Sequence, residues 1–108
     1  MKKHNKSNIN EKYIEHALNV LSGKWKLKVL WEVYSYDSIR FNQLQKNVEG
    51  ISSLMLTRVL KDLIDNKLLV RTQFNEVPPH VEYSLTDLGK SLCPIIRLLE
   101  GFGKSILQ

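Results

Sequence analysis

Hydroxyl and cationic side chains gather along one side of the segment 52–66, where they could bind base edges and phosphates of a nucleic acid. Leu56, Leu60 and Leu63 follow the spacing of a buried helical face, and Ser52 is suited to cap the helix. The side opposite these leucines carries Leu54, Thr57, Arg58, Lys61 and Asp65, with Ser53 on its flank near the N-terminus. Such a face is also typical of any solvated amphipathic helix, so its meaning depends on the neighbouring elements.

The polar residues of this face have distinct uses against a duplex. A helix in the major groove presents its N-terminal residues to the bases, which selects Ser53, Thr57 and Arg58 for direct reading. Arg58 could donate to O6 and N7 of one guanine, a contact that discriminates by about 1–3 kcal/mol. Lys61 lies farther along and is expected to meet a phosphate, and Ser52 completes the predicted contact set.

Two apolar residues of the first turn, Leu54 and Met55, have two open interpretations. An apolar side chain can meet the methyl group of a thymine, or it can pack in the core. Core packing is at least as good an interpretation for Met55.

A β-hairpin is expected to follow this helix, with strands over 68–74 and 81–85. Apolar and polar residues alternate over 81–85, which is typical of a half-buried strand. Pro78 and Pro79 lack a backbone N–H and cannot lie inside a central strand, so they belong at the hairpin tip. A projecting hairpin beside a recognition helix is the arrangement of a winged helix.

Polar side chains of this hairpin could reach a DNA backbone or minor groove. Asn75 and His80 are the expected tip contacts. Glu76 would be repelled by phosphate, so the tip is not expected to face DNA uniformly. Arg71 has two open interpretations, either a DNA contact or a cross-strand pair with Glu82.

The remaining elements are expected to be mainly helical. A very short strand is expected at Ile39-Arg40, and a turn at Glu49-Gly50 separates two helices into a helix-turn-helix. The expected helices cover residues 10–21, 24–35, 41–47, 52–66, 86–92 and 94–106. The predicted fold is therefore mainly α with a small β-hairpin (α+β), a winged helix-turn-helix with extra helices at both ends. Residues 1–9 are expected to be a disordered basic tail and residues 10–108 a single domain.

Positive charge is concentrated near the start of the chain. Residues 1–28 carry seven lysines and two glutamates, a net charge of +5, whereas the rest of the chain is neutral. A basic end suits a polyanionic partner such as DNA. Lys24 and Lys26 are expected to bind phosphate at the N-terminus of the helix 24–35. Arg40 could contact a phosphate or pair with an acidic side chain, and Trp25 is expected to pack in the core or at a hinge.

The first and last helices carry apolar stripes beyond the needs of a winged core. We expect these stripes to form a homodimer, since two half-sites multiply the selectivity of a small module. The predicted interface residues are Ile14, Ala17, Leu18, Leu21, Leu98, Leu99, Phe102 and Ile106.

Several sequence segments together resemble one family, the HxlR-type transcriptional regulators, which are relatives of the MarR group. The segments are Gly23-Lys24-Trp25, Arg40-Phe41-Asn42-Gln43-Leu44, Gly50-Ile51-Ser52, Leu56-Thr57, Leu60-Lys61-Asp62-Leu63 and the run from Val77 to Gly89. Their order and spacing cover about residues 13–103. The resemblance implies a dimeric bacterial or archaeal DNA-binding regulator. Many members carry a cysteine followed by a proline early in the first helix, where this chain has Lys12 and Tyr13, so the resemblance does not imply thiol sensing here.

Other classes of function find little support in the sequence. His4, His16 and His80 are scattered, without a cluster at metal-ligand spacing, so no enzyme, metal or cofactor site is expected. Cys93 is a lone cysteine beside apolar residues, which indicates packing and not redox chemistry. No apolar run approaches a membrane span, and the polar N-terminus lacks the apolar core of a signal peptide, so a cytoplasmic protein is expected.

The best interpretation is a sequence-specific transcriptional regulator that binds a double-stranded DNA operator as a homodimer. The helix 52–66 would enter the major groove, and the wing 69–85 would meet the flanking backbone or minor groove. An alternative is a winged-helix module that binds protein and not DNA. A third possibility is a regulator with a small-molecule effector at its dimer interface, although the sequence shows no pocket.

Overall fold

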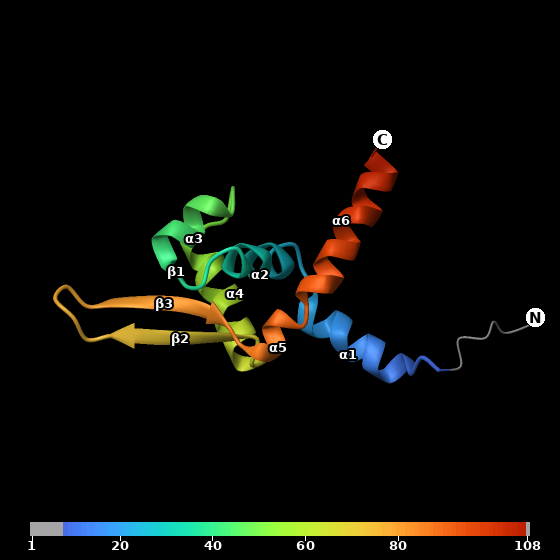
Figure 1. Cartoon of the computed structure of the whole chain (residues 1–108), viewed down its shortest axis with the longest axis horizontal. Coiled ribbons are helices and arrows are strands. Elements are labelled where there is room, and N and C mark those ends of the chain that lie inside the picture. Colours follow the sequence, from blue (N-terminus) through green and yellow to red (C-terminus); the bar gives the residue numbers. More distant parts are fainter. Residues whose placement is uncertain (1–7, 108) are drawn as a thin grey trace, which may run out of the picture.

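A computed structural model describes residues 8–107 of the chain, which contain six helices and three strands (Figure 1). In chain order these are α1 (Glu11–Leu21), α2 (Lys26–Tyr34), β1 (Ile39–Arg40), α3 (Phe41–Asn47), α4 (Ser53–Asp65), β2 (Leu69–Phe74), β3 (His80–Leu85), α5 (Asp87–Lys90) and α6 (Cys93–Leu107). The order and type of the expected elements are confirmed, and the fold is a winged helix-turn-helix. The expected tail lies mostly on residues 1–7, outside the described residues.

Side-chain caps fix the starts of three helices. The carboxamide oxygen of Asn10 accepts from the backbone N–H of Lys12 at 3.0 Å and starts α1. Ser52 and Thr86 cap α4 and α5 in the same way. Helix α2 begins only at Lys26, two residues later than expected, and its N-cap residue Trp25 makes no side-chain cap.

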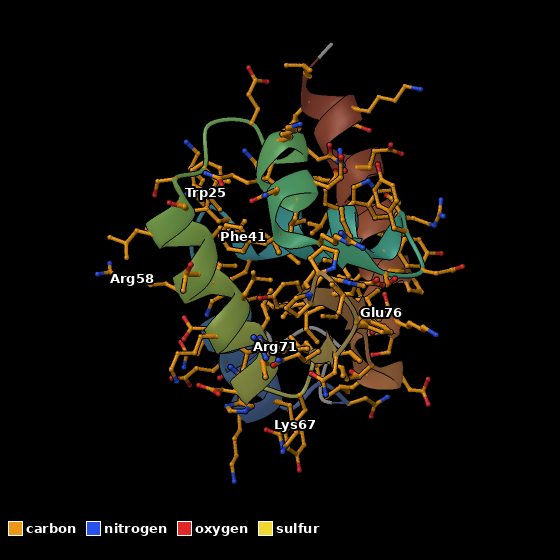
Figure 2. All side chains as sticks on the ribbon, turned by 90° about the vertical axis from the view of Figure 1, so that its left-hand side faces the viewer. Trp25, Phe41, Arg58, Lys67, Arg71 and Glu76 are labelled. Atoms are coloured by element: carbon orange, nitrogen blue, oxygen red, sulfur yellow. The ribbon has the colours of Figure 1, made fainter. Side chains whose placement is uncertain are left out.

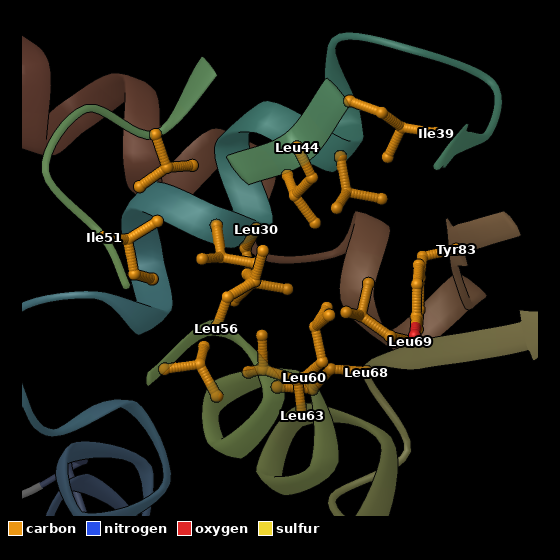
Figure 3. Close-up of a cluster of buried hydrophobic side chains, with 14 residues drawn as sticks. Leu30, Ile39, Leu44, Ile51, Leu56, Leu60, Leu63, Leu68, Leu69 and Tyr83 are labelled. Carbon is orange, nitrogen blue, oxygen red and sulfur yellow. The ribbon is translucent and has the colours of Figure 1, made fainter. Parts of the chain in front are cut away.

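The hydrophobic core lies between α2, α3, α4 and the sheet (Figure 3). Leu30, Leu44, Leu56 and Leu63 are fully buried there, which confirms the expected inner faces of these helices. Trp25 packs against this core from its edge, as expected.

The sheet is antiparallel, with β3 between β1 and β2. Ile39 pairs with Tyr83 on one side of β3, and Leu69 pairs with Leu85 at the inner end of the hairpin. All four are buried or half-buried. Along β3 only Tyr83 is fully buried, and Glu82 and Ser84 are half-buried like Val81 and Leu85, so the predicted alternation of burial is not found. The hairpin extends away from the helices as a wing (Figure 1).

The end of α4 sets the direction of β2. Lys67 adopts a left-handed backbone with a φ of 65°. Its N–H donates to the carbonyl of Ile64 at 2.9 Å, and the N–H of Leu68 donates to the carbonyl of Leu63 at 2.9 Å. These are the two hydrogen bonds of a Schellman motif, and Leu63 and Leu68 are both buried beneath it.

A close approach holds α5 on this same junction. The N–H of Thr86 donates to the carbonyl of Leu68 at 3.1 Å, and the hydroxyl of Thr86 donates to the carbonyl of Lys67 at 2.6 Å. A Cβ on Gly89 would lie 2.2 Å from the carbonyl oxygen of Leu68. Only glycine permits this packing.

The first and last helices form two arms at the end of the molecule opposite the wing (Figure 1). No residue of α1 is buried, and Cys93 is the only buried residue of α6. Every helix in residues 8–107 is too short or too polar to cross a membrane.

Candidate nucleic-acid interface

The solvent face of α4 carries the residues that the sequence predicted for base reading. Ser53, Thr57 and Arg58 are all exposed, while Leu56 and Leu60 face the core. Figure 2 shows Arg58 projecting from α4 into solvent. The structure therefore brings the three side chains to one exposed surface within the first two turns of the helix.

Hydrogen bonds at the start of α4 decide what its hydroxyl groups can offer a ligand. The Oγ of Ser52 accepts from the N–H of Met55 at 3.0 Å, which leaves the hydroxyl hydrogen of Ser52 available to donate. The hydroxyl of Thr57 donates to the carbonyl of Ser53 at 2.8 Å. Thr57 therefore presents an acceptor oxygen and a methyl group. Met55 is half-buried and packs against the core, which favours the packing interpretation for that residue.

The two cations of α4 differ in their partners. Arg58 has no hydrogen bond or ion pair among the described residues, so its guanidinium keeps all its donors for a ligand. The Nζ of Lys61 lies 3.0 Å from Oδ2 of Asp65. This hydrogen bond, with the charge of Asp65, raises the pKa of Lys61. The lysine stays charged, but its charge is partly balanced.

Lys24 and Lys26 were both predicted to bind phosphate at the N-terminus of α2, but the structure gives them different surroundings. Lys26 turns inward, where its Nζ donates to the carbonyl of Val20 at 3.0 Å and lies 3.9 Å from Oδ2 of Asp62. Lys26 is therefore engaged in packing α1 and α4 against α2 and is not free to reach a phosphate. Its inward direction depends on contacts with two other helices, which the local sequence does not reveal.

Lys24 and Lys28 form an exposed cationic pair instead. Their Nζ atoms lie 4.6 Å and 5.3 Å from the ring centre of Trp25. The ring of Trp25 lies beside the turn that precedes α4, since a Cβ on Gly50 would be 3.8 Å from it. The predicted contact set omitted Lys28, although its i, i+4 spacing from Lys24 was a usable signal.

Only one of the two residues expected at the tip of the wing lies there. Asn75 is exposed in the loop between β2 and β3. His80 is not at the tip but begins β3, with its side chain only 13% exposed. Its ring stacks on Phe74 with centres 4.7 Å apart, and its Nε2 lies 2.8 Å from Oε2 of Glu82. His80 supports the wing from inside, and its contacts leave it poorly placed to reach DNA.

The suggested pair between Arg71 and Glu82 is not formed, and that interpretation was wrong. The strand register sets Arg71 opposite Tyr83 and Thr72 opposite Glu82. Glu82 instead accepts a hydrogen bond from Ser38, and this bond, together with that to His80, lowers the pKa of Glu82.

Arg40 lies opposite Glu82 on the other side of β3. Arg40 is exposed, and its charge adds a smaller lowering of the pKa of Glu82. This placement favours an electrostatic role within the sheet while leaving the guanidinium open to solvent.

Arg71 belongs to a groove between α4 and the sheet. Figure 2 shows Arg71 beside the C-terminal half of α4. The groove has a volume of about 250 Å³ and places Arg71 and Lys61 on a common surface with Thr57. Asp65 also lines it, so its charge is mixed and positive on balance. The groove continues the polar face of α4 towards the wing.

Exposed apolar side chains also lie on both arms. Large side chains that stay exposed on α1 include Ile14 and Leu18, while Leu21 is half-buried against the core. The exposed apolar residues of α6 include Leu98, Leu99, Phe102 and Ile106. Ala17 is also exposed. The structure thus leaves seven of the eight predicted dimer residues exposed.

The candidates for redox or metal chemistry are the lone cysteine, which lies outside this interface, and the possible metal ligands. Cys93 is buried, and burial raises the pKa of its thiol. No three His, Cys, Asp or Glu side chains in residues 8–107 come together as a metal site.

Comparison with known proteins agrees with this geometry. Residues 20–108 match the model of the HxlR-like helix-turn-helix family. The chain is 37% identical over 91 residues to a protein of Fusobacterium mortiferum named as the regulatory protein MalR, covering 84% of this chain and 86% of that protein.

Solved structures show the same fold. A protein from Porphyromonas gingivalis W83 assigned to the MarR family of transcriptional regulators superposes with a TM-score of 0.80, at 34% identity over 96% of this chain and 97% of that one. The redox regulator HypR in its oxidised form has a TM-score of 0.79, at 34% identity over 86% of this chain and 95% of that one.

The fold and its polar helix face define a winged-helix, DNA-binding transcriptional regulator. The chain belongs to the HxlR-like helix-turn-helix family.

Proposed function

We propose that this regulator binds a double-stranded DNA operator as a homodimer, with the N-terminal half of α4 in the major groove of each half-site. The observation that carries the proposal is the exposed set of Ser53, Thr57 and Arg58 on one face of a capped helix. Arg58 is the principal base-reading residue because its five donors have no partner among the described residues. Its planar fork matches O6 and N7 of guanine.

Phosphate binding falls to the groups around the start of α4. The hydroxyl hydrogen of Ser52 is free to donate, and Lys24 and Lys28 lie over Trp25 beside the same turn. Together they form a cationic edge where one strand of the duplex would pass. Phosphate contacts of this kind set the position of the helix and carry no sequence information.

The wing would contact the backbone next to each half-site. Arg71 and Lys61 line the groove that leads from α4 to the sheet, and Asn75 is exposed farther out. The carboxylate of Glu76 lies near the tip, where a DNA phosphate would repel it. The base of the wing, not its extreme tip, is therefore the expected contact.

The arms would join the two subunits. Their exposed side chains form an apolar surface that the rest of the chain leaves uncovered. One winged module buries too little surface for selective binding in a genome, whereas two linked half-sites bind selectively. The need for selective binding thus accounts for the homodimer as well as for the base-reading face.

The test compares Arg58→Ala with Lys24→Ala. A duplex would be recovered by selection from genomic fragments, and a scrambled duplex would serve as the non-specific probe. Arg58→Ala should weaken binding to the selected duplex by about tenfold or more and leave the scrambled duplex little changed. Lys24→Ala should weaken both and reduce the salt slope by about 0.9 per subunit.

Lys90→Ala is the matched control, because Lys90 is an exposed lysine on α5 that lines a hollow with Tyr34 and Asp37, away from the N-terminal half of α4. It should leave both affinities and the salt slope unchanged. Equal losses on both duplexes for Arg58→Ala would remove Arg58 from base reading. Failure to select any duplex would favour a protein partner instead of DNA.

A further inference from the structure

An apolar side chain lies in the middle of the proposed base-reading surface. Leu54 is 63% exposed in the first turn of α4, between Ser53 and the buried part of the helix. It is the only large hydrophobic residue of α4 that is exposed. The other large exposed apolar residues lie mainly on the arms, so Leu54 is not an extension of the apolar surface proposed for dimerisation.

Leu54 has two neighbours on the helix surface. Thr57 is at i+3 and Arg58 at i+4, the spacings at which side chains on a helix meet. Thr57 has given its hydroxyl hydrogen to the carbonyl of Ser53, so it contributes a methyl group and an acceptor oxygen. Leu54 and Thr57 therefore form a small apolar patch beside the guanidinium of Arg58.

The direction of the Leu54 side chain places this patch at the N-terminal end of α4. Long side chains on a helix lean towards its N-terminus. The N-terminal turn of a recognition helix is the part that lies against base edges. The only apolar group displayed by any base pair in the major groove is the 5-methyl group of thymine.

We propose that Leu54 is a specificity-determining residue that reads the methyl group of one thymine in each half-site. The thymine lies next to the guanine bound by Arg58, because the two side chains are one helical turn apart. This proposal rests on the proposed function, and it adds a preference that hydrogen bonding alone would not give. It separates thymine from cytosine and also from uracil, which presents the same hydrogen-bonding groups.

The experiment removes the methyl group without changing any hydrogen bond. A random duplex pool is first selected with the wild-type protein, and the recovered duplex is then synthesised with uracil replacing each thymine in turn. One position per half-site should weaken wild-type binding by about fourfold, the effect of burying one methyl group. Leu54→Ala should bind the thymine and uracil forms of that position equally.

Leu88→Ala is the matched control, because Leu88 is 56% exposed on α5, beside the C-terminal end of α4 and not beside its N-terminal turn. It should keep the fourfold sensitivity of the wild type. If wild type and Leu54→Ala lose the same affinity at every uracil position, the proposal is overturned. In that case, retained selectivity and a large loss for Arg58→Ala would leave the proposed function standing, whereas failure to recover any duplex would overturn both.

Discussion

The core and the arms of this chain differ in how much of their apolar surface the chain itself buries. The helices α2, α3 and α4 pack with the sheet into a continuous hydrophobic core. By contrast, α1 contributes no buried residue and α6 only Cys93. The arm side chains Leu98 and Phe102 are 75% and 64% exposed. The chain thus buries the core of its winged module by itself but leaves the apolar side chains of its arms exposed.

Leucine substitutions in the core and in the arms should differ most strongly in their effect on the free energy of unfolding. Leu56 is 0% exposed, so Leu56→Ala should lower the free energy of unfolding by about 3 kcal/mol through lost burial and a residual cavity. Urea denaturation at low and high protein concentration should show the same loss. Leu98→Ala should differ from wild type only at the higher concentration, where association stabilises the arms.

An equal concentration-independent loss for both variants would contradict this contrast. It would mean that α6 packs on its own subunit as firmly as α4 does.

A charge on the arm should dissociate the subunits while leaving the core folded. Phe102→Glu would place a carboxylate in the apolar surface, where its desolvation is costly. We expect a sedimentation mass of one chain, unchanged far-UV circular dichroism and a loss of operator affinity of about 100-fold. Lys104→Glu is the control, since Lys104 is exposed on the opposite side of α6. A wild-type mass of one chain at micromolar concentration would refute the homodimer.

The features that could be predicted from the sequence depend on residues close together in the chain. Ser52 caps α4 by accepting from Met55, and the leucines of that helix follow one periodic pattern. The caps of α1 and α5 are equally local. For this reason the helix α4, its exposed face and the start of α5 were all predicted correctly.

The features that were missed depend on how separate helices and strands pack or pair with one another. Glu82 accepts from Ser38 across the sheet, so its partner is set by strand pairing and not by the nearby Arg71. Lys26 is turned inward by the carbonyl of Val20 and by Asp62 on α4. His80 is held by its stack on Phe74. No periodic pattern in the sequence reveals these directions.

The attachment of the wing should depend on pH through Glu82. The hydrogen bond from Ser38, followed by that to His80, lowers the pKa of Glu82 below its ordinary value of 4.5. A carboxylate with a lowered folded-state pKa adds stability above its unfolded pKa and loses it as the pH falls through the folded value. Glu82→Gln should therefore be less stable than wild type at pH 7, by less than the loss expected for Leu56→Ala.

The measurement is the difference between the urea midpoints of wild type and Glu82→Gln at pH values from 7 down to 3. The difference should shrink as the pH falls below the ordinary Glu82 pKa of 4.5. Ser38→Ala should remove part of the same pH dependence. A difference that stays constant down to pH 3 would show that the carboxylate bonds at the wing do not stabilise the fold.

The smallest expected effect is a change in the free energy of unfolding caused by a substitution at the C-terminal end of α4. Lys67 is the only non-glycine residue in the described part of the chain with a positive φ, and its conformation is needed for the Schellman bonds to Leu63 and Ile64. A left-handed conformation costs roughly 1–2 kcal/mol for an L-residue and little for glycine, while glycine adds about 0.5–1 kcal/mol of entropy loss on folding. Lys67→Gly should therefore raise the free energy of unfolding by about 0.5 kcal/mol and leave the subunit dissociation constant unchanged.

Asn66→Gly, one residue earlier, is the control and should destabilise, because Asn66 has a negative φ and its amide donates to the carbonyl of Asp62 at 2.9 Å. A Lys67→Gly protein that is less stable, or that dimerises differently, would show that the side chain of Lys67 contributes more than its backbone strain costs.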